Sequence, residues 1–373
     1  MKKLNYSIVI LIATAFLFIK CSSSSDNDAP DNFDRTELLT NWADNIIIPS
    51  NENYQLSVQD LAEKVTAFTS SPTSNSLQEM RSSWLTAYKS YQKTSMFVLG
   101  KAAEINLNES ANTYPTDVAG IENNIASGAY NLNLFAQFPK QGFPAIDYLI
   151  NGLGTTDNEI ISFYTTNSNA LSYKNYLTAI TTKLKTNIEA VVTDWNLNYR
   201  ATYIASSGIG VSSSISKTTN LFVKNLEKTI RTGKVGIPAG LFSNGTLYPE
   251  KVEAYYKNDV SRELLSTALQ AEQDFFNGKH ANSAEIGSSL KSYLIYQNAI
   301  RNGQNLGEII NNQFATIKTA IDQLNGSFST QVNSDNTKMV AVYNEMQQAV
   351  IYCKLDMMQA LNITIDYVDG DGD

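Results

Sequence analysis

The sequence predicts an all-α protein of two antiparallel four-helix-bundle-like domains in series, with irregular glycine- and proline-containing segments between the helices. Three observations predict this class. Apolar residues recur every three or four positions along most of the chain, which is the period of an amphipathic helix. Prolines are absent between Pro144 and Pro238 and again after Pro249, so long stretches lack the strongest helix breaker. Strand-like alternation is confined to one late segment, LNITIDYV.

The first twenty residues, MKKLNYSIVILIATAFLFIK, predict an export signal, because two lysines precede an apolar run from Ile8 to Ile19. As a helix that run would cover roughly 18 Å, which is short of the ~30 Å hydrocarbon core. Cys21 follows directly and is succeeded by SSSSDNDAPDN. We therefore predict a lipoprotein signal peptide over 1–20, lipid on Cys21 and a disordered tether over 21–33. Lys20 departs from the small residue usual at that place, and a plain secretory signal is the alternative.

The folded part is predicted to begin near Phe33. Helical apolar faces are predicted over 77–95, 177–195, 286–300, 306–324 and 339–357. The break at Arg301–Gln304 predicts a turn between two helices. Because the remaining chain exceeds what one hydrophobic core usually serves, we expect an N-terminal bundle over 34–168 and a C-terminal bundle over 169–373.

Two segments interrupt the helical pattern, from Tyr114 to Gly154 and from Gly233 to Pro249, and both are rich in glycine and proline. Irregular segments held on rigid helices often form binding surfaces, since their backbone groups are free to meet a ligand. A plain crossover between helices explains them equally well. The sequence leaves open whether the two segments meet in one cleft.

Charge and cysteine content limit the classes of partner. The formal charge is −8, and loss of residues 1–20 with their three lysines makes it −11. An acidic surface repels phosphate backbones, so nucleic acid is not expected as a partner. With Cys21 lipidated, Cys353 would be the only thiol left, which excludes an intramolecular disulfide.

The residue inventory excludes several catalytic sites. His280 is the only histidine and lies in the turn-like stretch NGKHANS, where a solvated loop residue is expected. One histidine and one free cysteine cannot build an HExxH helix or a Cys/His zinc site. A carboxylate-only site for a hard cation stays open, with Asp117, Glu122 and Asp147 as its candidate ligands.

Four stretches resemble the imelysin-like family of exported bacterial helical proteins. They are RSSWLTAYKSYQKTSMFVLGKA at 81–102, NTYPTDVAGIENNI at 112–125, QGFPAIDYLINGLG at 141–154, and the long stretch from Glu227 to Gly278 that contains GKVGIPAGLFSNGTLYP. The third stretch is similar to the GxHxxE segment of the family. The fourth is similar to a signature of its lipoprotein branch.

This resemblance implies two bundle domains with a cleft between them, an outer-membrane location in the cell envelope, and a link to iron or haem acquisition. It can be carried over only at matching positions. Gly142 matches the glycine of the motif, Pro144 replaces its histidine, and Asp147 replaces its glutamate. Proline offers no ligand atom, so Asp147 alone remains as a weak candidate for holding iron or another divalent cation.

The leading hypothesis is a membrane-anchored, non-catalytic binding lipoprotein that works with an outer-membrane uptake system for iron or haem. Its candidate cleft contains Asp117, Glu122, Gly142, Pro144 and Asp147. One alternative is a metallopeptidase of the imelysin type, against which the lost histidine argues. Another is a surface glycan-binding lipoprotein that uses some of its 20 tyrosines and 3 tryptophans for stacking.

Overall fold

A computed structural model describes residues 31–368 of the chain. The predicted signal peptide, Cys21 and most of the tether lie outside the described residues. In chain order the α-helices are α1 Arg35–Asn41, α2 Ile48–Ser70, α3 Ser74–Gln92, α4 Lys101–Glu104, α5 Leu107–Asn112, α6 Val118–Ser127, α7 Gly142–Asp147, α8 Asp157–Thr165, α9 Ala170–Asp194, α10 Arg200–Ala205, α11 Ser214–Lys224, α12 Ser261–Asn277, α13 Leu290–Tyr296, α14 Leu306–Ile321, α15 Phe328–Ser334, α16 Asn336–Ile351 and α17 Met358–Ala360.

Several helices continue into wider or tighter turns. The π-helical segments are Trp42–Ile47, Tyr148–Gly152, Trp195–Tyr199, Asn225–Gly236 and Tyr352–Met357, and the 3-10 segments are Phe135–Lys140 and Pro249–Lys251. The only strands within residues 31–368 are β1 Ile300–Arg301 and β2 Gln304–Asn305, which pair antiparallel. The predicted all-α class is therefore confirmed.

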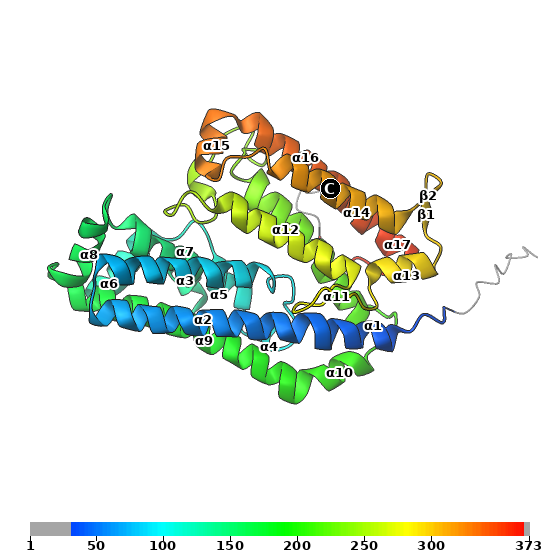
Figure 1. Cartoon of the computed structure of the whole chain (residues 1–373), viewed down its shortest axis with the longest axis horizontal. Helices are drawn as coiled ribbons and strands as arrows, with labels where there is room; N and C mark the ends of the chain where they lie inside the picture. Colours follow the sequence, from blue (N-terminus) through cyan, green and yellow to red (C-terminus); the bar gives the residue numbers. More distant parts are fainter. Residues whose placement is uncertain (1–30, 369–373) are drawn as a thin grey trace, which may run out of the picture. The chain divides into compact units, whose positions relative to one another are not determined.

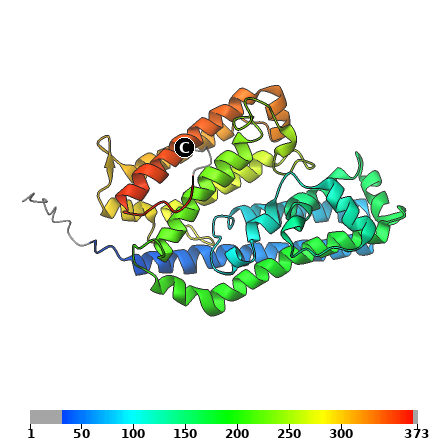
Figure 2. The ribbon, with the colours of Figure 1, turned by 180° about the vertical axis from the view of Figure 1, so that it is seen from behind.

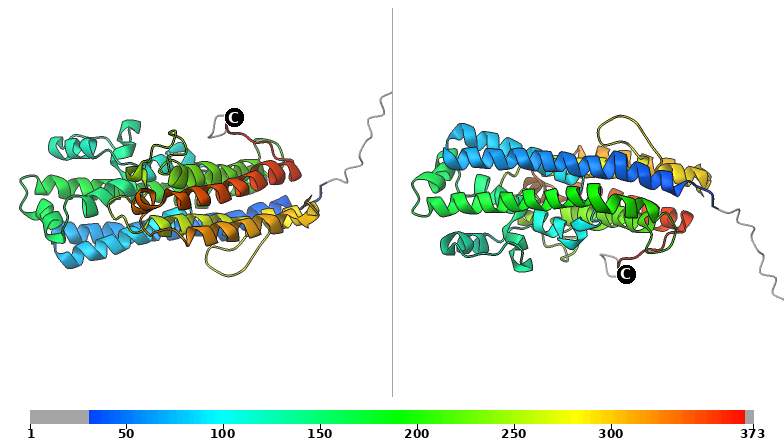
Figure 3. Two further views of the ribbon diagram at one scale, coloured as in Figure 1. Left: turned by 90° about the horizontal axis from the view of Figure 1, so that it is seen from above. Right: turned by 90° about the horizontal axis from the view of Figure 1, so that it is seen from below.

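In the first half of the chain, α2 packs along both α3 and α9, and the two views in Figure 1 and Figure 3 agree on this arrangement. The predicted face of α3 points into this core, where Leu77, Met80, Trp84 and Tyr88 are fully buried. Burial of each such side chain contributes roughly 1.5–3 kcal/mol. α3 begins at a capping box, in which Thr73 and Ser76 satisfy each other's backbone N–H groups.

In the second half, α16 packs against α14 and against the π-helical segment Asn225–Gly236, as seen from behind in Figure 2. α12 contacts α14, the same π-helical segment and α3. It therefore connects the second group of helices to the first. From Asp34 onward the chain forms one compact unit. The division into two bundles at residue 168 stays a prediction.

One predicted helix is shorter than its apolar pattern indicated. The stretch 286–300 is helical only over α13, which begins after the N-cap Ser289. Ile286 is 68% exposed and lies in a bridge with Lys279. The break at Arg301–Gln304 is a β-turn hairpin between α13 and α14, and LNITIDYV forms no strand. Short alternation without a partner strand cannot satisfy a ladder of hydrogen bonds, so the pattern was misleading there.

The remaining helix predictions agree with the structure. The faces over 77–95, 177–195, 306–324 and 339–357 correspond to α3, α9, α14, and α16 with its π-helical continuation. None of the helices within residues 31–368 is both long enough and apolar enough to cross a bilayer.

Candidate functional site

The stretch QGFPAIDYLINGLG folds into α7 and a π-helical turn, and its first glycine is required by the packing. Gly142 has φ +77°, and a Cβ atom there would lie 2.2 Å from the carbonyl oxygen of Ala111. Only glycine allows both this conformation and this close approach. The Trp84 indole donates a hydrogen bond of 3.2 Å to the Phe143 carbonyl, so the start of α7 is held directly against α3.

Pro144 occupies the first turn of α7, where the missing N–H costs no helical hydrogen bond. Pro144 and Asp147 both line a cavity of about 190 Å³. Its other lining residues are Tyr114, Pro115, Thr116, Glu250, Val252, Ala254, Tyr255 and Tyr256. The first irregular segment, 114–154, therefore contacts residues 250–256, which directly follow the second irregular segment, 233–249.

Asp147 is 1% exposed, and its carboxylate holds a distant segment of the chain. The backbone N–H of Tyr256 donates to Oδ2 at 2.9 Å, and that of Lys257 donates to Oδ1 at 2.9 Å. The Asn151 amide also donates to Oδ1, at 2.9 Å. Burial raises the pKa of Asp147 to about 7, while the three N–H donors and the Lys257 charge act in the opposite direction.

These contacts decide what the motif position can bind. A carboxylate has about four lone-pair sites, and three of those on Asp147 already accept hydrogen bonds. Pro144 supplies no ligand atom. The residues present therefore do not fit a transition-metal ion, which needs several nitrogen, sulfur or oxygen ligands at once. Within residues 31–368, no three His, Cys, Asp or Glu side chains form a group that could hold a metal ion.

Asp117 and Glu122 have separate roles and do not line this cavity. Asp117 is the N-cap of α6 and accepts a 2.9 Å hydrogen bond from the N–H of Gly120. Glu122 accepts hydrogen bonds from the hydroxyls of Tyr148, at 2.7 Å, and Tyr173, at 2.5 Å. Of the five residues predicted for the cleft, only Pro144 and Asp147 line this cavity.

A buried ion pair beside the cavity was not predicted. Lys234 pairs with Glu253, and each residue is 2% exposed. Glu253 also accepts hydrogen bonds from Gln92, at 2.9 Å, and Asn112, at 2.7 Å. Burial raises the pKa of the cavity-lining Tyr114 far above its usual value, and the Glu253 charge adds to this effect. The sequence signal was available, since Lys234 lies in the quoted stretch GKVGIPAG.

The π-helical segment Asn225–Gly236 carries a second buried network. Glu227 accepts hydrogen bonds from Lys354, at 2.9 Å, and from the Tyr367 hydroxyl, at 2.7 Å. The guanidinium of Arg231 lies 3.8 Å from Glu227 and donates to the Tyr343 hydroxyl at 2.7 Å. These buried charges are paired, as the low dielectric of a protein interior requires. π-Helical turns of this kind often occur at functional sites.

His280 lies in the loop after α12, as predicted, but it is only partly solvated. Its side chain is 19% exposed and its Nδ1 lies 3.4 Å from Glu285. All three tryptophans, Trp42, Trp84 and Trp195, are fully buried in the core. None of them is available to stack on a glycan.

Comparison with known proteins gives consistent results. The imelysin family model matches residues 47–351. Iron-regulated protein A from Synechococcus elongatus is 19% identical over 319 residues, covering 82% of this chain and 80% of that protein.

Two crystal structures share the fold. An imelysin-like protein from Psychrobacter arcticum 273-4 superposes with a TM-score of 0.68 at 16% identity, covering 89% of this chain and 97% of that one. A protein from Parabacteroides distasonis ATCC 8503, described as a candidate iron-regulated protein A precursor, gives 0.69 at 16% identity, with 87% and 95% covered.

Proposed function

Because the chain belongs to the imelysin family, we propose that it is an exported lipoprotein, held to the outer membrane through Cys21, that serves iron or haem uptake as a non-catalytic binding component. The name of its cyanobacterial relative supports the link to iron. The N-terminal sequence supports the lipid anchor, since an apolar run ends directly at Cys21 and a polar tether follows.

The hydrogen bonds that the buried Asp147 carboxylate accepts are the main support for a non-catalytic role. A metallopeptidase needs a metal that activates water, and its protein ligands must leave one coordination position open. Here Pro144 has no ligand atom, and the Asp147 carboxylate already accepts hydrogen bonds from three N–H groups. The cavity is therefore better suited to holding the chain together than to cleaving a peptide.

The peptidase alternative is tested by incubating the purified protein with unfolded polypeptides, with and without chelator. We expect no cleavage that depends on metal. Chelator-sensitive cleavage that disappears in Asp147→Ala would establish the enzyme and overturn the proposal.

The iron part is tested by equilibrium titration of the purified protein with ferrous iron, ferric iron and haem. We expect saturable binding of at least one iron-containing ligand at micromolar concentration, with no contribution from Asp147. Lack of saturable binding for all three would remove the link to iron.

The anchor is tested separately in cells. Labelled palmitate should be incorporated into the wild-type protein and not into Cys21→Ser, which should leave the membrane fraction. Membrane association that persists in unlabelled Cys21→Ser would contradict the lipid anchor.

A further inference from the structure

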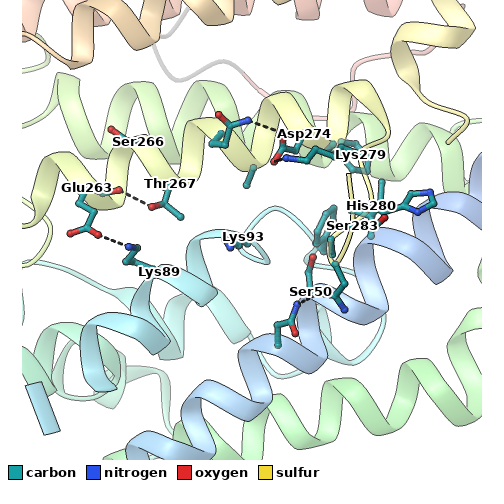
Figure 4. Close-up of a pocket in the computed structure, with 18 residues that line it drawn as sticks. Ser50, Lys89, Lys93, Glu263, Ser266, Thr267, Asp274, Lys279, His280 and Ser283 are labelled. Atoms are coloured by element: carbon teal, nitrogen blue, oxygen red, sulfur yellow. Dashed lines mark hydrogen bonds and ion pairs between the residues drawn. The ribbon is translucent and has the colours of Figure 1, made fainter. Parts of the chain in front are cut away.

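A second cleft is separate from the motif cavity. It has a volume of about 740 Å³ and lies between α2 and α3 on one side and α12 with the following loop on the other. Figure 4 shows the side chains that line it. This volume falls within the range of roughly 300–1,000 Å³ that is usual for small-molecule sites.

Positive charge gathers in this cleft although the protein as a whole is acidic. Lys89, Lys93 and Lys279 line it, against two acids. Lys89 pairs with Glu263, and Lys279 lies 3.4 Å from Asp274. Lys93 is exposed and has no ion-pair partner among residues 31–368.

A fourth lysine adds to the positive field. Lys318 donates hydrogen bonds to Gln270 and Gln273, and Gln270 lines the cleft. Burial lowers the pKa of Lys318; the charges of Asp274 and Asp322 raise it, and the charge of Lys279 lowers it. A ligand with negative charge would favour the charged form of this lysine.

The floor of the cleft is apolar. It contains Phe97 and Phe275, whose rings meet edge to face with centroids 5.5 Å apart, together with Ile46 and Ala271. Hydroxyls that could accept or donate a hydrogen bond also line the cleft, and those of Ser50 and Ser266 have no hydrogen-bond partner within residues 31–368. An apolar body with a few convergent polar groups is the usual composition of a ligand site.

We propose that this cleft binds a small organic anion, whose acid group pairs with Lys93 and whose apolar body lies on Phe97 and Phe275. The charge balance favours an anion over a cation, and the floor favours a ligand with an apolar part over a bare inorganic ion. The proposal does not depend on iron binding or on the motif cavity, and it can stand or fall by itself.

The test is a fluorescence titration of the purified protein with 8-anilinonaphthalene-1-sulfonate, followed by displacement with decanoate and, as a neutral control, decanol. We expect one saturable site from which decanoate displaces the probe and decanol of equal chain length does so far less well. Lys93→Glu should weaken probe binding by about tenfold, because it replaces an attraction by a repulsion at a partly exposed site.

Two further variants separate the cleft from the general surface. Ala271→Phe fills the apolar floor and should abolish saturable binding. Lys338→Glu changes another exposed lysine, on α16, and this variant should bind the probe like the wild type. Because Lys93 is on the surface, its variant is expected to fold, and circular dichroism checks this. The proposal is overturned if the probe has no saturable site, or if Lys93→Glu and Ala271→Phe bind it as the wild type does.

Discussion

Asp147→Asn tests most directly how the buried Asp147 carboxylate contributes to stability. The wild-type side chain accepts three N–H hydrogen bonds, two of them from the backbone of Tyr256 and Lys257. An asparagine keeps one carbonyl oxygen, and its NH2 group then faces a backbone N–H. A buried donor that loses its acceptor costs about 1–3 kcal/mol, so the variant should be less stable at acid pH.

The same substitution also removes a group whose ionisation is unfavourable in the folded protein. The folded pKa of Asp147 is raised from 3.8 to about 7. The folded state therefore holds its proton where the unfolded state has released it. The stability that this proton contributes is fully present below the unfolded pKa and is lost as the pH rises towards 7. Each pH unit in this window costs about 1.4 kcal/mol.

Between about pH 5.5 and pH 8, the wild type should therefore lose roughly 2 kcal/mol of unfolding free energy through Asp147 alone. The asparagine variant lacks this loss, so the stability gap between the two proteins should narrow by the same amount. Urea unfolding followed by circular dichroism at both pH values measures the gap. Other titrating groups contribute equally to both proteins and cancel. A gap that stays constant within about 0.5 kcal/mol would refute the reasoning.

Three further substitutions test other parts of the account. Burial raises the pKa of Glu272 from 4.5 to about 8, so this residue should cost the wild type roughly 3 kcal/mol of unfolding free energy between about pH 5.5 and pH 8. Glu272→Gln should not show this loss in the same urea assay. A variant with the same pH profile as the wild type would contradict the prediction. Gly142→Ala should lower the free energy of unfolding by about 2–4 kcal/mol, because the added Cβ atom meets the backbone in a strained conformation. Gly128 has φ +63° but open space around it, so Gly128→Ala should lower it by only about 1 kcal/mol. Thermal unfolding measures both values, and equal losses would contradict the clash at Gly142. Lys234→Met should lower the free energy of unfolding by about 3–5 kcal/mol, because it leaves the Glu253 carboxylate buried and unpaired. Adding Glu253→Gln removes that charge and should restore part of the stability. A double variant no more stable than the single one would show that the pair is not coupled.

The helical class could be predicted because its signal is local. Trp84 and Tyr88 fall on the buried face of α3, as their spacing indicated, since an apolar stripe repeated every three or four residues has one stable arrangement. The helix prediction over 286–300 was wrong outside α13, because only part of the apolar pattern in that stretch is buried. Gly278 ends α12 in a left-handed conformation, and the loop that follows leaves Ile286 exposed.

The site could be predicted only in part, because its partners are distant in sequence. The motif resemblance indicated Gly142, Pro144 and Asp147, and of these Pro144 and Asp147 line the cavity. Of the three hydrogen bonds to Asp147, only that of Asn151 is local, and the other two come from backbone groups 109 and 110 residues away. No local pattern encodes the two distant contacts. The same holds for Glu253, whose partners Gln92 and Asn112 are 161 and 141 residues away.

The central claim is that Asp147 serves the fold and does not hold a transition metal. The most direct test is a crystal of the protein soaked in zinc or ferrous iron, with anomalous diffraction recorded at the absorption edge of the metal. We expect no ion bonded to the Asp147 carboxylate, and the N–H groups of Tyr256 and Lys257 still at hydrogen-bond distance from it. A strong anomalous peak coordinated directly by Asp147 would contradict the claim.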